Sequence, residues 1–290
     1  NKKRKKSEQQ IANLKNAYKL IRNIKPKKNK FFLEESLLKD INKIITYKSE
    51  EETHVPGQYR NDIVYVGDKN HGGKYTPPKI LDDIKLLMGE FISWINSEAL
   101  CKEDDAIRAA LVHYHIGLIH PFSNGNGRTA RVAEAIILKC SGIRFVPHNL
   151  SNYYYRNIDD YFWAFSLSKK NKECDITPFL SFYLKGLIES LKEIQEKIYF
   201  WIRILTLRDF YKQKKERKEL NKRQYELLDF LLSNDQAFSL KDLYEKPGLR
   251  ILYSGKSERT ARRDLIKLID NKCLKLNEKE LYTINYFLLD

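Results

Sequence analysis

The segment that most constrains the fold is residues 104–140, where two apolar helical patterns are separated by a proline and a glycine-rich turn. The first pattern runs to Ile119. Pro121 ends or kinks that helix, because proline lacks an N–H and restricts the residue before it. The turn Asn-Gly-Asn-Gly at 124–127 follows, and a new helix begins at about Arg128. The sequence therefore predicts two helices joined by a tight turn.

This turn combines a base with the residue types of an anion site. His120 places a titratable imidazole at the end of the first helix. Gly125 and Gly127 let a phosphate approach the backbone, and free N–H groups at the start of the next helix attract it. Arg128 and Arg131 are three residues apart, so both guanidinium groups can reach one polyphosphate. Residues 120–131 contain no Gly-Lys-Ser/Thr, so this turn is not a Walker P-loop. The layout favours phosphoryl or nucleotidyl transfer.

Residues 120–131, His-Pro-Phe-Ser-Asn-Gly-Asn-Gly-Arg-Thr-Ala-Arg, resemble the motif of the Fic (Fic/Doc) family, His-Pro-Phe-x-(Asp/Glu)-Gly-Asn-Gly-Arg-x-x-Arg, at every fixed position except one. The likeness covers about residues 31–200. Residues 56–67 look like the family's flap, and residues 151–184 look like its downstream helices. The resemblance implies a mainly α-helical bundle with a small β-hairpin flap that transfers AMP from ATP to a Ser, Thr or Tyr hydroxyl of a target protein.

The resemblance also implies a role for each motif residue. His120 is the general base, since an imidazole with a pKa near ~6.5 accepts a hydroxyl proton at neutral pH. The flap residues hold the target in extended form by strand addition, which orients a backbone without reading its sequence. The nucleotide-binding residues are Gly125, Asn126, Gly127, Arg128 and Arg131. The target-binding flap residues are Ile63, Val64, Tyr65 and Val66.

The position that departs from the motif is Asn124. The family places Asp or Glu there to hold Mg²⁺, and an amide oxygen is a neutral, weaker ligand for a hard cation. ATP and Mg²⁺ are therefore the expected cofactors, with a weakened metal site. Three outcomes stay open: Mg²⁺ held mainly by the nucleotide phosphates, a lower rate, or a different transferred group.

Charge divides the chain into unequal parts. The formal net charge of the whole chain is +15, but residues 1–30 sum to +11, residues 31–200 to −2 and residues 201–290 to +6. A general abundance of lysine accounts for this equally well as an anionic partner. We expect a basic N-terminal helical arm at 1–30, a catalytic domain at 31–210 and a separate domain at 218–290.

The pattern of residues 218–290 is that of a winged helix-turn-helix domain. Three helical segments are followed by two short apolar strands around residues 277–278. The third helical segment buries one apolar stripe and leaves a basic face. Such a face suits the phosphates and guanine edges of a major groove, although winged helices also bind proteins. The candidate DNA-binding residues are Arg259, Arg262 and Arg263.

Two further groups of residues have simpler explanations. His113 and His115 lie on different helix faces, and His113 is about 10 Å from His120 along the helix, too far for a shared metal ion. We expect both to be structural. The aromatic runs 153–155 and 161–163 offer stacking faces for an adenine, but aromatic clusters more often form core.

Composition limits the remaining possibilities. No stretch approaches the ~18 apolar residues of a membrane span, and no secretory signal is visible. The four cysteines are scattered, which excludes a Cys-x-x-Cys site and favours a reducing cytoplasm. Candidate partners are a hydroxyl-bearing target protein, DNA and a second copy of the chain. The expected function is protein adenylylation; the alternative is a transcriptional regulator that senses ATP through a degenerate site.

Overall fold

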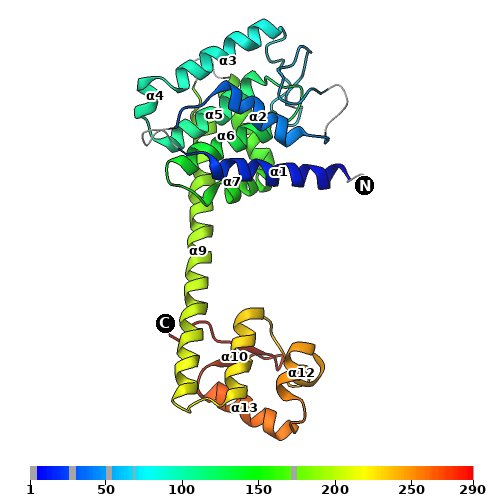
Figure 1. Cartoon of the computed structure of the whole chain (residues 1–290), viewed down its shortest axis with the longest axis vertical. Coiled ribbons are helices and arrows are strands. Elements are labelled where there is room, and N and C mark those ends of the chain that lie inside the picture. Colours follow the sequence, from blue (N-terminus) through cyan, green and yellow to red (C-terminus); the bar gives the residue numbers. More distant parts are fainter. Residues whose placement is uncertain (1–4, 26–30, 50–53, 68, 171–174, 290) are drawn as a thin grey trace. The chain divides into compact units, whose positions relative to one another are not determined.

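The chain is mainly helical and divides into two compact units, Asn1–Ile194 and Gln195–Asp290. A computed structural model describes residues 5–25, 31–49, 54–67, 69–170 and 175–289 (Figure 1). Each unit has its own hydrophobic core. Within the described ranges, no helix has the length and apolar character that crossing a membrane requires.

The first unit is built from helices. In its described residues these are α1 (Lys6–Asn23), α2 (Glu35–Thr46), α3 (Leu81–Ile95), α4 (Glu98–Lys102), α5 (Asp105–Ile119), α6 (Asn126–Cys140), α7 (Val146–Arg156), α8 (Ile158–Lys170) and the first part of α9 (Thr177–Glu216).

The centre of this unit is the pair α5 and α6, which form the most extensive helix–helix contact of the chain. Small residues let the two backbones approach: Ala109 and Ala110 on α5 and Ala130 and Ala133 on α6 are completely buried. Because α5 and α6 flank the glycine turn, their packing fixes both ends of the predicted site.

Helix α1 packs against α2 and α6 and adds Ala17 and Ile21 to the same core. Hydrogen bonds also hold the C-terminal end of α1 against α6. The Lys139 ammonium of α6 donates to the carbonyls of Ile21 and Arg22 (2.9 and 3.1 Å), which satisfies acceptors that every helix end leaves unpaired. The expected division into 1–30, 31–210 and 218–290 stays a prediction. Helix α1, expected as a separate arm, lies within the first unit.

The described residues between α2 and α3 form no helix or named strand. Within them, Val66 and Tyr75 form an isolated β-bridge through two backbone hydrogen bonds of 2.9 Å. The sequence predicted a small β-hairpin here. The described residues form an extended loop closed by this isolated bridge, because glycines at 67, 72 and 73 adopt positive φ angles that interrupt strand geometry.

The second unit contains the rest of α9 and a small mixed domain. Its described elements are α10 (Lys222–Asn234), α11 (Asp242–Glu245), α12 (Pro247–Tyr253), α13 (Glu258–Asp270), β1 (Leu274–Leu276) and β2 (Tyr282–Ile284). Strands β1 and β2 are antiparallel, with Leu274 opposite Ile284, and Phe238 forms an isolated bridge to Tyr282. The winged-helix assignment of this unit stays a prediction.

A buried carboxylate joins the helices of the second unit. Asp264 of α13 is 2% exposed and accepts hydrogen bonds from Arg223 Nε (2.7 Å) and Gln224 Nε2 (3.1 Å) of α10. A buried charge is tolerated only when paired in this way. These bonds fix α13 against α10, so the remaining face of α13 is held outward.

Candidate functional site

His120 ends α5 with its backbone in the left-handed region, at φ 51° and ψ 56°. This conformation is uncommon for a residue with a β-carbon, and Pro121 prevents the helix from continuing. The imidazole Nδ1 lies 3.3 Å from the Gly117 carbonyl oxygen. Because a carbonyl only accepts, Nδ1 carries the hydrogen and Nε2 keeps its lone pair.

The pKa of His120 is lowered to about 4: burial is the largest cause, the hydrogen bond with the Gly117 carbonyl partly offsets it, and the positive charge of Arg60 adds a smaller lowering effect. Removing an imidazolium from water is unfavourable, so the neutral form is retained at pH 7. The side chain therefore lies in the protonation state and tautomer that a proton acceptor needs.

Gly125 allows the turn to pass close to α2. Its φ is +81°, and a β-carbon there would lie 2.7 Å from Thr46 Cγ2. The buried amide of Asn42 on α2 fixes this approach: its Nδ2 donates to the Asn124 carbonyl (3.0 Å), and its Oδ1 accepts from the Gly57 N–H (3.0 Å). One side chain thus joins the turn to the start of the flap.

Asn126 organises the turn through both ends of its amide. Its Oδ1 accepts from the Phe122 N–H (2.9 Å) and its Nδ2 donates to the Phe122 carbonyl (2.6 Å). The side chain is 2% exposed. Because the side chain is buried and bonded to Phe122 through both its oxygen and its nitrogen, the group that Asn126 presents at the start of α6 is its backbone N–H, together with those of Gly127 and Arg128.

The Asn124 side chain does not fit a protein-held metal ion. Its Oδ1 accepts from the Gly125 N–H (2.8 Å) and from Arg128 Nη2 (3.4 Å). No group of three or more His, Cys, Asp or Glu side chains within the described ranges is arranged to hold a metal. Mg²⁺ prefers carboxylate oxygens, and here the position holds a neutral amide already bonded to two donors.

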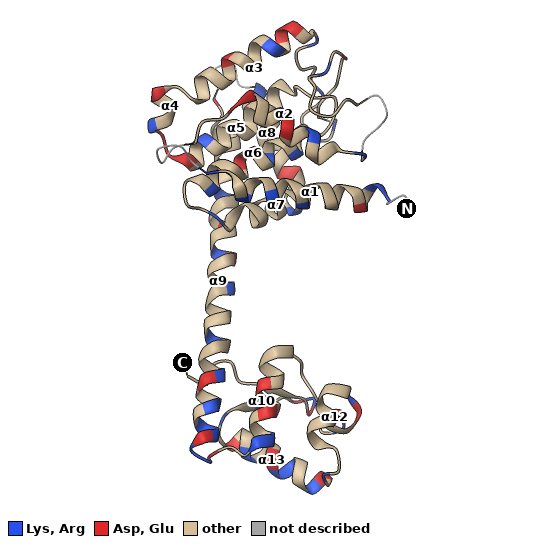
Figure 2. Ribbon diagram, in the orientation of Figure 1, with Lys and Arg blue, Asp and Glu red and all other residues tan. Residues whose placement is uncertain are grey.

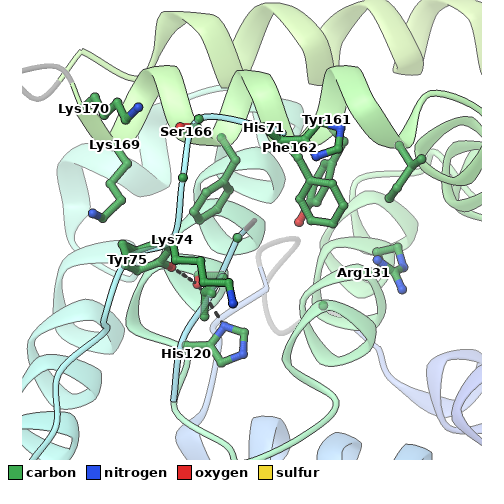
Figure 3. Close-up of a pocket in the computed structure, with 18 residues that line it drawn as sticks. His71, Lys74, Tyr75, His120, Arg131, Tyr161, Phe162, Ser166, Lys169 and Lys170 are labelled. Atoms are coloured by element: carbon green, nitrogen blue, oxygen red, sulfur yellow. Dashed lines mark hydrogen bonds between the residues drawn. The ribbon is translucent and has the colours of Figure 1, made fainter. Parts of the chain in front are cut away.

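The two arginines of α6 have different surroundings. Arg128 reaches back to the turn and to the Ile45 carbonyl (3.4 Å). Arg131 lines a pocket (Figure 3), and no described residue forms a hydrogen bond or ion pair with its guanidinium. A guanidinium is a strong phosphate ligand, because its planar fork of donors can bind two phosphate oxygens at once.

The pocket has a volume of about 280 Å³ and combines three parts of the first unit. His120, Gly127 and Arg131 come from the motif. Figure 3 shows His120 and Arg131 below Tyr161 and Phe162 of α8. The flap closes another side. The remaining lining side chains that carry charge, hydroxyl or ring groups are His71, Lys74, Tyr75, Tyr161, Phe162, Phe165, Ser166, Lys169 and Lys170.

Aromatic residues of α8 form the floor of this pocket. Tyr161 and Phe162 line it as the sequence suggested, and Phe165 extends the surface. Tyr153 and Tyr154 are instead buried core residues. Aromatic faces beside a phosphate-binding helix end suit a purine base.

A buried polar network lies behind the floor. Glu134 of α6, 2% exposed, accepts from His113 Nδ1 at 2.5 Å and from the Tyr154 hydroxyl at 2.8 Å. The other His113 nitrogen lies 3.2 Å from the Tyr161 hydroxyl. His115 hydrogen-bonds to Leu111 O (2.8 Å). Both histidines therefore occupy structural positions, and His113 also positions a ring of the pocket floor.

The flap presents an open backbone edge. Ile63 and Tyr65 are exposed by 56% and 69%. The backbone groups of residues 63–65 make no hydrogen bonds with any part of the chain that the structure describes. Val66 lines the pocket, so the free edge begins next to it.

The buried guanidinium of Arg60 holds both ends of the flap, a role that was not predicted from the sequence. It donates to the carbonyls of His120 (2.7 Å), Asp62 (2.6 Å) and Pro78 (2.6 Å). Burial lowers the pKa of Arg60. The three carbonyl acceptors around the guanidinium show this role, and the sequence alone contains no spacing that predicts it.

The flap also contacts α8. His71 Nε2 lies 3.0 Å from Asp159 Oδ1, and its ring packs against Phe162 with centroids 5.5 Å apart. A β-carbon on Gly72 would lie 2.2 Å from Ser166 Oγ. The flap tip is therefore packed closely on the helix that forms the pocket floor.

The predicted DNA-binding residues lie on one exposed face of α13. Arg259, Arg262 and Arg263 are all exposed, and Figure 2 shows basic residues recurring along this helix. They border a shallow groove with Ile266. Arg262 also pairs with Glu258 at 2.6 Å, a contact that competes with any anionic ligand.

Comparison with known proteins gives consistent matches. Residues 32–138 match the model of the Fic/DOC family. A protein named "Protein adenylyltransferase Fic" from Drosophila yakuba is 33% identical over 147 residues, 50% of this chain and 25% of that protein. The protein of the same name from Aedes aegypti is 33% identical over 145 residues, with the same coverage. The match thus spans about a quarter of the length of these relatives.

Solved structures give a likeness of fold. A Fic family protein from Desulfovibrio desulfuricans G20 superimposes with a TM-score of 0.57 at 17% identity, covering 98% of this chain and 76% of that one. Fic-1 from C. elegans superimposes with a TM-score of 0.51 at 19% identity, covering 68% and 54%. At these identities the superpositions concern the fold alone.

Proposed function

From the premise that this chain carries a domain of the Fic/DOC family, we propose that it is a protein adenylyltransferase, which moves AMP from ATP to a Ser, Thr or Tyr hydroxyl of a target protein. The observation that carries the proposal is one pocket lined by a neutral His120 and the guanidinium of Arg131, at the start of α6. Relatives named as protein adenylyltransferases support the same reaction.

The chemistry starts at His120 Nε2. The target hydroxyl gives its proton to this nitrogen while its oxygen attacks the α-phosphorus of ATP. The bond between the α-phosphorus and the oxygen that bridges to the β-phosphate breaks, and pyrophosphate leaves. Because Nδ1 is held as a donor to Gly117 O, Nε2 is the nitrogen that accepts the proton.

Charge that develops on the departing pyrophosphate is stabilised by the start of α6. The backbone N–H groups of Asn126, Gly127 and Arg128 have no earlier helical turn to bond to, and they point along the helix axis toward the anion. Arg131 adds a bidentate donor. Removing one such donor typically slows a reaction by about 10²–10³-fold.

Residues 63–66 of the flap receive the target. Residues 63–65 make no backbone hydrogen bonds with the described chain, whereas Val66 is paired with Tyr75. An unpaired strand edge accepts an extended peptide through backbone hydrogen bonds. The exposed side chains of Ile63 and Tyr65 add apolar contact. The edge ends at the pocket, which brings a hydroxyl of the bound segment near His120.

Among the residues that the structure describes, no group of carboxylates is arranged to hold a metal at Asn124, and the chemistry above does not depend on such a group. When a divalent ion accompanies ATP, it neutralises phosphate charge. This chain's own residues bind the nucleotide, orient the hydroxyl and accept the proton.

Labelling with α-³²P-ATP and with γ-³²P-ATP tests the proposal. Adenylylation transfers label to protein only from the α-position, and His120→Ala removes it. Transfer of the γ-label would instead mean phosphorylation. If no label is transferred with any divalent metal while ATP still binds, the chain is an ATP-sensing regulator, and the transferase proposal is wrong.

We also propose that α13 binds duplex DNA. Arg259, Arg262 and Arg263 form an exposed basic face on a helix that Asp264 holds against α10. Lysine and arginine contacts to phosphates make such binding salt-dependent.

An electrophoretic or anisotropy assay with random-sequence duplex tests this. The Arg262→Ala/Arg263→Ala variant is expected to bind at least ten times more weakly and with a smaller salt slope. A matched control is Lys212→Ala/Lys215→Ala, which removes equal charge from α9. Unchanged binding by the α13 variant would exclude this surface.

A further inference from the structure

A chain of polar side chains leads from the buried core of the first unit to the pocket. Glu134 Oε2 lies 2.5 Å from His113 Nδ1, and His113 Nε2 lies 3.2 Å from the Tyr161 hydroxyl. Glu134 and His113 are 2% and 0% exposed, whereas Tyr161 lines the pocket. The chemistry proposed above uses none of these three groups. The chain therefore ends in a hydroxyl whose role in the pocket is unassigned.

The charge of the buried pair decides in which direction the last hydrogen bond runs. His113 is the ion-pair partner of Glu134 within the described residues. A buried carboxylate without a counter-charge is costly, so the pair is most stable when its total charge is zero. Such a pair holds two hydrogens, and only one fits between Glu134 and Nδ1, so the other lies on Nε2. His113 Nε2 therefore donates to the Tyr161 oxygen.

The Tyr161 hydroxyl keeps its own hydrogen for another acceptor. Burial raises the pKa of Tyr161, and the positive charge of Arg131 only partly opposes this, so the hydroxyl stays protonated at neutral pH. In the part of the chain that the structure describes, its hydrogen-bond partner is His113. Because the oxygen accepts from that ring, the O–H group is polarised and becomes a stronger donor. The hydroxyl is thus a directed donor for a ligand.

The surroundings of this hydroxyl favour an anion. Figure 3 shows it pointing away from α8, on the side of His120 where Arg131 lies, with Lys169 and Lys170 on the other side. Gly127 and Arg131 line the same pocket, so the start of α6 contributes backbone N–H groups and a guanidinium there. A hydroxyl donor beside these groups suits a phosphate oxygen.

We propose, building on the proposed function, that Tyr161 is a further catalytic residue, whose hydroxyl donates to the pyrophosphate part of ATP. When the bond between the α-phosphorus and the bridging oxygen breaks, negative charge moves onto the pyrophosphate, and this hydrogen bond becomes stronger. The proton stays on Tyr161 throughout, and the target's proton still goes to His120. His113 and Glu134 are positioning residues, because they set the direction in which the hydroxyl donates.

Kinetics of two tyrosine variants test the catalytic role. Tyr161→Phe removes the donor and keeps the ring, and kcat for adenylylation should fall about 100-fold, the loss typical of one such donor. The matched control Tyr154→Phe removes the other hydroxyl that donates to Glu134 and should keep nearly the wild-type kcat. Circular dichroism checks that both variants fold. Equal losses in the two variants would mean that the network only supports the fold, and would contradict the proposal.

Binding of inorganic pyrophosphate, measured by titration calorimetry, separates this inference from the transferase proposal, because it requires no transfer. Tyr161→Phe should bind pyrophosphate about tenfold more weakly, as expected for one lost hydrogen bond to a charged group. Tyr154→Phe should bind it as the wild type does. A Tyr161→Phe chain with wild-type affinity would overturn the inference even if adenylylation occurs. Weakened binding in a chain that transfers no label would reject the transferase proposal and retain Tyr161 as a phosphate donor.

Nitrogen NMR of the full chain, labelled with ¹⁵N-histidine, tests the direction of the hydrogen bond. At pH 7, Nε2 of His113 should carry a hydrogen, and contacts between this ring and the Tyr161 ring assign the signal. An Nε2 without a hydrogen would mean that Tyr161 donates to His113. The hydroxyl would then have no hydrogen for a phosphate, which would contradict the proposal.

Discussion

His120 combines two constraints in one residue. Its left-handed backbone turns the chain out of α5, and its buried imidazole is held neutral with Nε2 unprotonated. A histidine in solution is largely neutral at pH 7 as well, but it becomes protonated near pH 6.5. The folded site extends the neutral form to much lower pH.

The burial of His120 should therefore change how kcat/KM depends on pH. We expect kcat/KM for adenylylation to stay level down to about pH 5 and to fall with an apparent pKa of about 4. Initial rates with a hydroxyl-bearing acceptor, measured between pH 4 and 8, check this. An acidic limb centred near pH 6.5 would contradict it.

The lowered pKa of His120 also affects the free energy of unfolding. The unfolded chain takes up a proton on this imidazole near pH 6.5, whereas the folded chain does so only near pH 4. The free energy of unfolding therefore falls as the pH drops through this window, and the full contribution is present above pH 6.5.

Asn124 is the residue at which a single change should increase activity. Asn124→Asp supplies a carboxylate at the position where an amide now accepts from Gly125 and Arg128. We expect Mg²⁺-dependent labelling to rise about tenfold, since a carboxylate is a much better Mg²⁺ ligand. Titration of the labelling rate with Mg²⁺ measures it. Asn124→Gln, which keeps an amide, should show no gain, and equal rates for Asp and Asn would refute the role of this position.

At the scale of elements, the flap depends on a buried guanidinium rather than on a hairpin. Arg60 joins the carbonyls of His120, Asp62 and Pro78, which lie at the site and at the two ends of the flap. Arginine can reach three acceptors because its donors form a planar fork, and lysine presents one nitrogen.

Replacing this side chain should loosen the flap. We expect Arg60→Lys to lower the free energy of unfolding by about 3 kcal/mol, because two charge-assisted hydrogen bonds are lost. Urea denaturation measures it, and limited proteolysis should show faster cleavage within the flap. Arg144→Lys, an exposed control, should change stability by less than about 0.5 kcal/mol. Equal effects of the two variants would mean that Arg60 does not hold the flap.

Much of the helical framework was predictable from the sequence. The helix that ends before Pro121 and the helix that follows the glycine turn are present, because proline and glycine act locally. Helix α12 was not expected, and α7 begins at Val146, before the segment 151–184 in which the resemblance implied helices. Each has a proline in its first turn, at position 147 or 247, which in a sequence indicates the end of a helix but is favourable in the first helical turn.

The residues of the candidate site that lie in one short segment were predictable from the sequence. Residues 120–131 form the turn, and His120 and Arg131 line one pocket. The supporting residues were not predictable, because Asn42, Arg60 and Glu134 act through contacts with residues 15 to 87 positions away in the chain. Such contacts depend on tertiary packing and leave no local spacing pattern.

At the scale of the whole molecule, one helix contributes to two separate cores. α9 places Phe179 and Tyr183 in the first unit and Leu207 and Tyr211 in the second. Separate cores of this size are expected to unfold as separate cooperative steps.

Calorimetry should resolve these steps. We expect two transitions, of which a non-hydrolysable ATP analogue raises only the one belonging to the first unit, because ligand stabilises the unit that binds it. Leu228→Ala, at a fully buried site of α10, should lower only the other transition, by roughly 10 °C or more. A single transition shifted by both changes would contradict independent cores.

The aromatic floor of the pocket belongs to α8, whereas His120, the proposed proton acceptor, follows α5. This separation affects how the sequence can change during evolution. Substitutions at Phe162, Phe165 or Lys169 alter the part of the pocket lining on which we expect the base of a nucleotide to lie, yet they leave the turn before α6 untouched. Selectivity and chemistry can therefore vary separately. A lineage, or a directed-evolution experiment, could change which nucleotide is accepted through α8 alone, while the histidine and the phosphate-binding helix start stay as they are.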